Sequence, residues 1–260
     1  MPTTSPVPPL KRRDLASQAI TPLHRPRNWS KADVSLVEWP AASGQQLVIK
    51  DFARRPLWFR ILLGRLLLKR EWHALCALQD IEAVPTAYHR IDADAFIMEY
   101  CPGEKIDDVS EADMPPGLVS CIEDLVKTIH ARGVTHGDLH TSNVLITRNG
   151  CGFALIDWAT ACYFGPQPRN WRKVLFHELA ALDDRSMAKL KVTYQPESVS
   201  ERQRHLLLNG GSPVYRAFKS MRHFVQRLRG HDNRTAQARK IEGYQKRLEQ
   251  HKPPGGSHTN

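Results

Sequence analysis

The chain has 260 residues, of which 41% are hydrophobic, so it can bury the core of one large domain or of two small lobes. Lys and Arg outnumber Asp and Glu by 37 to 27, and residues 201–260 alone carry 13 basic and 4 acidic side chains. No apolar run reaches the roughly 20 residues that span a bilayer, and no signal-peptide pattern precedes Lys11, so we expect neither a transmembrane helix nor a secretory leader.

The cysteines and the basic tail indicate the cellular location of the protein and the type of partner it binds. Five cysteines are scattered without a Cys-x-x-Cys pair, which favours a reducing cytoplasmic location over a disulfide framework. The basic tail suggests an anionic partner such as a membrane surface, a nucleic acid or a phosphorylated sugar, although a tail that only aids solubility is an alternative. No base-reading module is visible, so we do not expect a nucleic acid partner.

The N-terminal part begins with a proline-rich segment. Residues 1–27 carry six prolines and few periodic apolar residues, so we expect them to be disordered or loosely docked. Two strand-like segments follow, Val34–Trp39 and Gln46–Phe52. Lys50 interrupts the apolar second strand, and a buried ammonium is costly without a partner. The alternative is a lysine on an edge strand with a solvated head group.

A candidate partner for Lys50 lies on the next predicted helix. Leu67–Gln79 has apolar residues at three- and four-residue spacing, and Glu71 is its only acid. We expect an ion pair between Lys50 and Glu71, whose loss would cost several kcal/mol if both side chains are buried. The alternative is a glutamate near the helix N-terminus that interacts with the helix dipole.

An unusual segment separates the two charged residues. Ala53–Lys69 carries five basic residues and no acid, interleaved with Leu, Ile, Trp and Phe. This composition is typical of an amphipathic helix at an anionic membrane surface, where each cation contributes about 1 kcal/mol. A helix packed on the N-terminal lobe is the alternative. Gly64 predicts a kink.

Further elements follow in order. Ala87–Ile91 and Ala95–Tyr100 predict two strands joined by a turn, and Cys101-Pro102-Gly103 then interrupts the regular structure. Leu118–Ala131 has the apolar spacing of a helix, which Gly133 ends.

A β-hairpin is predicted from two short apolar runs. Val144–Ile146 and Phe153–Ile156 flank Asn149-Gly150, and both residues of this dipeptide tolerate a positive φ. Because a hairpin brings its ends together, Asn143 before the first strand is expected beside Asp157 after the second.

Three polar side chains should then face one point, since Asp138 lies on the loop five residues before Asn143. Carboxylate and amide oxygens suit Mg²⁺, which is usually held by one or two protein groups plus substrate phosphates. Asp138 is left to accept a proton from an attacking hydroxyl. The alternative is that Asp138, Asn143 and Asp157 are ordinary turn and cap residues.

The C-terminal part is predicted to be helical. Helices are expected over residues 171–182, 185–194 and 205–209, and a basic amphipathic helix over residues 214–229. Residues 231–260 are expected to be disordered.

This pattern resembles the catalytic core of the protein-kinase-like superfamily. The resemblance rests on His-Gly-Asp-Leu-His-x-x-Asn from His136, on Ile156-Asp157-Trp158, and on the Leu/Arg-rich segment before the Glu71 helix. The resemblance covers about residues 28–200. Within the superfamily, the chain resembles bacterial lipopolysaccharide (Kdo/heptose) kinases and RIO-type atypical kinases.

The resemblance implies an α+β, two-lobed protein-kinase-like fold, with a small β-rich N-lobe that holds one helix and a mainly helical C-lobe. Its expected boundaries are an N-terminal segment, an N-lobe, a C-lobe, and a basic helix with a disordered tail, over residues 1–27, 28–100, 101–213 and 214–260.

The resemblance also implies roles for the site residues. Lys50 would reach the ATP phosphates and pair with Glu71, Asp138 would be the catalytic base, and Asn143 and Asp157 would bind Mg²⁺. His136 would hold the backbone of the catalytic loop. The adenine would meet the gatekeeper Met98, the backbone of Glu99 and Cys101, and Leu145 as its floor.

Four departures from the kinase pattern stand out. Gly137 precedes Asp138 where many regulated kinases have Arg, and Trp158-Ala159 stands where Phe-Gly is usual. No Ala-Pro-Glu motif follows, so control by activation-loop phosphorylation is not expected. No Gly-x-Gly-x-x-Gly occurs either, and the phosphate-covering turn is expected around Asn28–Asp33.

The implied activity is transfer of the ATP γ-phosphate to a hydroxyl, with Mg²⁺. We favour a lipopolysaccharide-core sugar at the inner face of the membrane, with the enzyme cytoplasmic and peripheral on that membrane. A protein serine/threonine kinase is the close alternative. Two other classes stay open: an inactive kinase-like scaffold, and a metallohydrolase that would use His136, Asp138 and His140 as ligands.

Overall fold

The computed structural model describes residues 7–26, 31–110, 113–147, 152–208 and 234–250. The chain divides into two compact units, one of Met1–Met114 with Ser142–Tyr163 and the other of Pro115–Thr141 with Phe164–Asn260. The predicted hairpin thus belongs to the first unit, whereas the sequence placed it in a C-lobe over residues 101–213. The reason is long-range pairing, because Leu155 N–H donates to Ala83 O at 2.8 Å and β8 pairs with β6.

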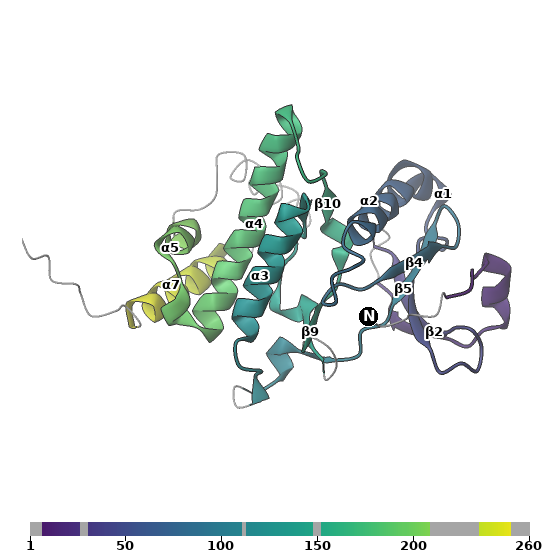
Figure 1. Cartoon of the computed structure of the whole chain (residues 1–260), viewed down its shortest axis with the longest axis horizontal. Helices are drawn as coiled ribbons and strands as arrows, with labels where there is room; N and C mark the ends of the chain where they lie inside the picture. Colours follow the sequence, from purple (N-terminus) through teal and green to yellow (C-terminus); the bar gives the residue numbers. More distant parts are fainter. Residues whose placement is uncertain (1–6, 27–30, 111–112, 148–151, 209–233, 251–260) are drawn as a thin grey trace, which may run out of the picture. The chain divides into compact units, whose positions relative to one another are not determined.

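A five-stranded antiparallel sheet forms the centre of the first unit (Figure 1). Its order is β1 (Ile20–His24), β2 (Asp33–Glu38), β3 (Gln46–Asp51), β5 (Ala95–Glu99) and β4 (Ala87–Arg90). Four of these strands were predicted to within two residues at each end. β3 is central in the sheet, and its residues from Leu47 to Lys50 are buried.

A nearly continuous helical segment accompanies this sheet. It consists of α1 (Leu57–Phe59), a π-helical turn η2 (Arg60–Gly64) and α2 (Arg65–Cys76). α2 packs against β4 and β5, and the Trp72 and Phe96 rings meet edge to face with centroids 5.7 Å apart. Gly64 ends the π-helical turn and keeps a right-handed helical backbone, so the kink expected there stays a prediction.

Residues 7–26 of the N-terminal segment are packed on the sheet, whereas residues 1–27 were predicted to be disordered or loosely docked. They form the 3₁₀ helix η1 (Arg12–Ser17) and the strand β1, and Leu10 is 1% exposed in a core with Val37, Leu47, Ile49 and Ile97. Leu10 N–H donates to His89 Nε2 at 2.8 Å, and Trp39 Nε1–H donates to Pro8 O at 2.8 Å. The prolines misled the prediction because these partners lie far away in the sequence.

A second, small sheet completes the first unit. Its order is β6 (Glu104–Lys105), β8 (Val144–Ile146) and β9 (Phe153–Leu155), with η3 (Ile106–Asp108) after β6 and η5 (Thr141–Asn143) before β8. The antiparallel pairing of β8 with β9 confirms the hairpin, while residues 148–151 of its loop lie outside the described part. The chain continues into η6 (Trp158–Thr160) and β10 (Cys162–Tyr163).

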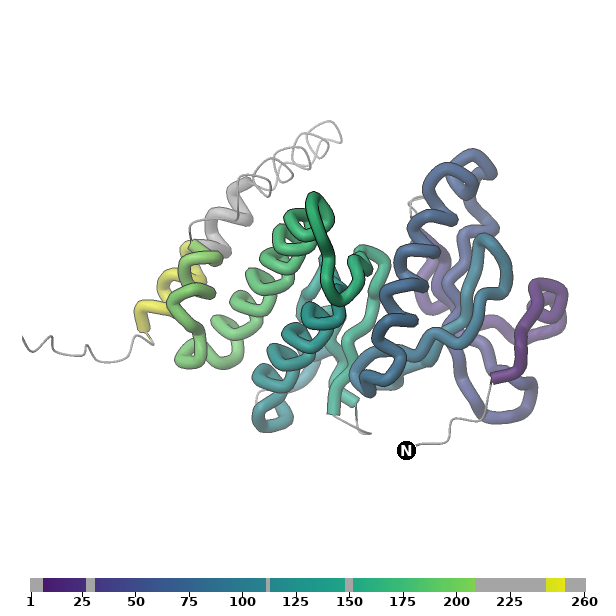
Figure 2. The backbone as a smooth tube through the Cα atoms, turned by 45° about the horizontal axis from the view of Figure 1, so that its top comes forward, coloured from purple at the N-terminus to yellow at the C-terminus, as the bar shows by residue number. Residues whose placement is uncertain are grey.

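The second unit is mainly helical, so the predicted α+β class is confirmed. It contains α3 (Leu118–Ala131), β7 (Val134–Thr135), α4 (Asn170–Tyr194), η7 (Pro196–Ser198), α5 (Glu201–Leu208) and α7 (Arg234–Gln250). α3 and α4 lie side by side, and α5 and α7 pack against α4 (Figure 2).

Two helix predictions in this unit were wrong. The helices predicted over residues 171–182 and 185–194 are one helix, because Asp183 points inward to hydrogen-bond partners and does not end the helix. Residues 234–250 of the predicted disordered tail form α7, whose Leu248 is buried against Val192 and Leu207. The predicted basic helix over residues 214–229 lies outside the described part.

Within the described ranges, none of the helices combines the length and the apolar character that crossing a membrane requires.

Candidate active site

A buried ion pair joins β3 to α2. Lys50 and Glu71 are 5% and 3% exposed, and Lys50 Nζ contacts Glu71 Oε1 directly. Lys50 pairs with Val34 on one side and Phe96 on the other, so it lies on a central strand and not on an edge. Glu71 lies in the middle of a helical segment that starts at Leu57, so it is not a dipole-capping residue. The predicted ion pair is confirmed.

A second carboxylate meets the same ammonium. Asp157 Oδ1 lies 3.4 Å from Lys50 Nζ, and the Asp157 side chain is 47% exposed. Burial by itself lowers the pKa of Lys50, but the negative charges of Glu71 and Asp157 outweigh burial and raise this pKa above its ordinary value. Lys50 is therefore a fixed positive charge beside a carboxylate that solvent can reach.

The backbone at Asp157 is held in an uncommon conformation. Asp157 has φ 60° and ψ 67°, the left-handed region that Asp tolerates at a cost of about 1 kcal/mol. The residues on both sides are anchored: Ile156 N–H donates to Asn143 O at 2.8 Å, and the buried Trp158 donates Nε1–H to Leu155 O at 2.8 Å. The surrounding structure thus determines where the Asp157 carboxylate points.

Asn143 lies where the hairpin prediction put it. It precedes β8, and the hydrogen bond from Ile156 N–H to its carbonyl closes the open end of the hairpin next to Asp157. One amide and one carboxylate oxygen near an ATP phosphate fit Mg²⁺, because this ion takes few protein ligands and keeps its other positions for phosphates and water.

The residues predicted to meet adenine also belong to the first unit. Met98 is 8% exposed on β5, between Val48 of β3 and Ala87 of β4. At Glu99 the strand ends in a reciprocal contact, since its N–H donates to Thr86 O at 2.8 Å and its Oε2 accepts from Thr86 N–H at 3.0 Å. Cys101 follows, half-buried, and Leu145 is buried on β8. Their contact with a nucleotide remains a prediction.

The loop that carries Asp138, in the second unit, is organised by an acid that was not predicted from the sequence. Asp183 of α4 is 1% exposed, and its carboxylate accepts the N–H groups of His136 and Gly137, each at 2.8 Å. His130 Nε2 lies 3.1 Å from Asp183 Oδ2. Helical spacing could have identified Asp183 as a buried residue. It lies three residues after Ala180 and four before Met187, which are both buried, so the three share one face of the helix.

Asp138 follows these anchored residues and is exposed. Gly137 has φ +79°, so the residue before Asp138 adopts a conformation that Gly takes at little cost. The ring of His136 is fully buried, and its Nδ1 accepts Asp138 N–H at 3.3 Å, which agrees with the predicted role of His136 in holding the loop backbone. In the described residues no group of three or more His, Cys, Asp or Glu side chains is arranged to hold a metal ion.

The two units divide the predicted site residues unevenly. The first unit holds all of them except the predicted catalytic base, namely Lys50, Glu71, Met98, Glu99, Cys101, Asn143, Leu145 and Asp157. Asp138 belongs to the second unit, with the Asp183 contacts that hold its loop. The structure brings Lys50, Glu71 and Asp157 together around one ammonium group.

Comparison with known proteins identifies one family. The RIO domain model matches residues 60–200, more than half of the chain. Among solved structures, the chain is similar to the Rio2 kinase–ADP/Mg²⁺–phosphoaspartate complex from Chaetomium thermophilum, with a TM-score of 0.49 and 16% identity over 88% of this chain and 71% of that one. No curated protein matches the chain.

Proposed function

Because the chain belongs to the RIO family of atypical kinases, we propose that it transfers the γ-phosphate of ATP to a serine or threonine hydroxyl of a protein. The family has a protein-kinase-like fold, and the chain is accordingly a phosphotransferase with an alcohol group as acceptor. The observation that carries the proposal is the cluster of Lys50, Glu71 and Asp157, where a permanent cation and a reachable carboxylate meet.

In this proposal Lys50 contacts the α- and β-phosphates. Its ammonium is buried and held by Glu71, so it needs little reorganisation to meet a phosphate oxygen. Met98, Leu145 and the backbone of Glu99 and Cys101 would hold the adenine.

Asn143 and Asp157 would hold the magnesium ion. Bound Mg-ATP supplies the phosphoryl group and the divalent cation that neutralises its charge. The left-handed backbone at Asp157 supports this role, because strained residues of this kind cluster at ligand sites.

Asp138 would act as the catalytic base. Its loop is fixed through the backbone N–H groups of His136 and Gly137, so the exposed carboxylate can orient an acceptor hydroxyl and take its proton.

A second candidate acceptor is a sugar of lipopolysaccharide. The sequence favours it through two basic amphipathic elements that would hold the enzyme at the membrane. One of them, residues 214–229, lies outside the described part, and in the other Arg60 and Arg65 are paired with Asp94. What still favours a lipid-linked acceptor is the exposed apolar face between residues 57 and 66.

The test offers γ-labelled ATP to the full chain with two acceptor pools, total cell protein and purified lipopolysaccharide. Labelled protein is expected, and Asp157→Asn, whose side chain has nearly the same shape, should label nothing. Label in lipopolysaccharide alone would replace the first candidate by the second. If the wild-type chain labels neither pool, including itself, the phosphotransferase proposal fails.

A further inference from the structure

The helical segment of the first unit exposes an apolar surface, which we call the outer face. Its six side chains are 46% to 66% exposed and follow one another within ten positions: Leu57, Trp58, Ile61, Leu62, Leu63 and Leu66. Single exposed leucines are normal on a protein, but a contiguous group of large apolar side chains marks an interaction site.

The π-helical turn produces this face. The inward residues of the segment are Phe59, Gly64 and Leu68, so the first two are five positions apart, as the i to i+5 bonding of a π turn requires. With the four-residue spacing of an α-helix, the inward residue before Gly64 would be Arg60 and not Phe59. Gly64 is buried against the rings of Phe52 and Phe59, where a Cβ would lie 3.4 Å from the Phe52 ring, an ordinary van der Waals distance. The core thus takes Phe59, and the neighbouring leucines point outward.

The charges around the outer face are cationic. No acid occurs between Asp51 and Glu71, and Glu71 is buried against Lys50. Arg54 and Lys69 are exposed, and neither forms an ion pair with any residue that the structure describes. The outer face is therefore apolar with cations at both ends of the segment.

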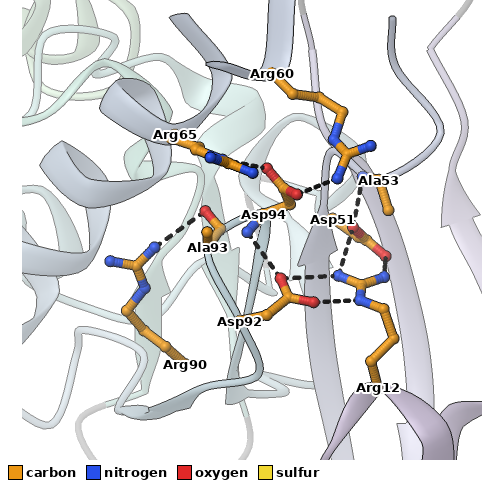
Figure 3. A network of polar contacts seen from close by, with 9 residues as sticks. All are labelled: Arg12, Asp51, Ala53, Arg60, Arg65, Arg90, Asp92, Ala93 and Asp94. Atoms are coloured by element: carbon orange, nitrogen blue, oxygen red, sulfur yellow. Dashed lines mark hydrogen bonds and ion pairs between the residues drawn. The ribbon is translucent and has the colours of Figure 1, made fainter. Parts of the chain in front are cut away.

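The other arginines of the segment serve the fold. Arg60 and Arg65 both bind the carboxylate of Asp94, which is 4% exposed (Figure 3). Arg55 donates to Asp33 and to Lys31 O. A test of surface charge must therefore change Arg54 and Lys69, since changing Arg60 or Arg65 would remove one of the two cations that compensate the buried Asp94 carboxylate.

We propose that the outer face docks the protein on a bilayer that contains anionic phospholipids, with the six apolar side chains inserted at the level of the headgroups. The apolar side chains suit the acyl boundary of such a bilayer, and the basic residues beside them are complementary to its negative charge. A second copy is a poorer occupant, because a two-fold contact would set the same cations against each other. Nucleic acid would engage the cations but leave the leucines exposed.

The experiment measures co-sedimentation of the full chain with vesicles of phosphatidylcholine alone or with added phosphatidylglycerol. Binding is expected only with the anionic lipid and should weaken as salt is added. Each neutralised cation should weaken partitioning about fivefold, so Arg54→Gln/Lys69→Gln should lose about 25-fold. Leu62→Ser/Leu66→Ser should lose more than about tenfold.

The matched control is Arg13→Gln/Lys127→Gln, which removes the same charge from side chains that are 78% and 65% exposed elsewhere. It should bind like the wild type, with a change below about twofold. Equal loss in the control and in Arg54→Gln/Lys69→Gln would overturn the proposal, as would a lack of binding to anionic vesicles. Self-association that the Leu62→Ser/Leu66→Ser change abolishes would also overturn it. The readout is lipid binding, so it is independent of phosphotransfer.

Discussion

Lys50 Nζ lies 3.4 Å from Asp157 Oδ1, although 107 positions separate the two residues in the chain. The contact links the central strand of the sheet to the exit of the β8–β9 hairpin. It places the Asp157 carboxylate, proposed to bind the metal, beside the Lys50 ammonium, proposed to bind the phosphates. A nucleoside triphosphate with Mg²⁺ requires this arrangement.

The first prediction concerns Lys50→Met. It should abolish the rise in melting temperature that Mg-ATP causes and should lower the free energy of unfolding by about 3–5 kcal/mol, because Glu71 is left buried without a cation. Lys191→Met is the matched control, since Lys191 is a buried lysine whose Nζ lies 2.9 Å from Glu123 Oε1. The control should lose stability but keep the response to Mg-ATP.

If Lys50→Met proves too unstable to measure, Lys50→Arg retains the charge but not the compact ammonium that fits between the two carboxylates. A full Mg-ATP response in either variant would contradict the role given to Lys50.

The second prediction separates the base from the metal ligand. Asp138→Asn should lower the rate of phosphotransfer about 10²- to 10⁴-fold and leave the Mg-ATP affinity nearly unchanged, because only proton acceptance is lost. Asp157→Asn should weaken the affinity for Mg-ATP itself, which isothermal titration calorimetry with and without Mg²⁺ can measure. If the two variants have the same binding defect, the division of roles is wrong.

The third prediction concerns Asp183 as a positioning residue. Asp183→Asn removes the negative charge that accepts the His136 and Gly137 N–H groups, and should cost about 2–3 kcal/mol of stability. The turnover rate should fall while the KM for ATP stays unchanged, because the loop that carries Asp138 is loosened. Asp184→Asn, at the adjacent half-buried position, is the control. Equal rates for the two variants would remove the positioning role.

The fourth prediction is a pH dependence at the N-terminal segment. Burial lowers the pKa of His89, and His89 Nε2 accepts the Leu10 N–H, so the folded chain holds the neutral imidazole. Because the folded pKa is the lower one, this stability is fully present above the unfolded value of about 6.5 and is lost as the pH falls below it.

Hydrogen exchange at Leu10, relative to the intrinsic rate of the peptide, should therefore accelerate as the pH falls below about 6.5. Leu10→Ala should expose the segment at every pH, at a cost of about 2–5 kcal/mol. Exchange at Leu10 that follows the intrinsic pH dependence alone would contradict the coupling to His89.

The sequence by itself determined the elements with short-range patterns. Each of these patterns is local. Apolar strand-like runs predicted β2 and β3, the apolar spacing of Leu118–Ala131 predicted α3, and Asn-Gly between two apolar runs predicted the hairpin. The Lys50–Glu71 pair was also predictable, because a cation in a buried strand requires an acid and only one was near.

Only the tertiary structure decided the rest, because the partners lie far apart in the sequence. Leu10 is held by the sheet core and by His89, which a count of prolines cannot reveal. Asp183 continues α4 because its carboxylate has backbone donors at residues 136 and 137. The sequence showed that residues 53–69 are basic and apolar. The π-helical turn and Asp94 decided which cations are bound to the fold and which leucines face outward, since burial follows from packing and not from composition.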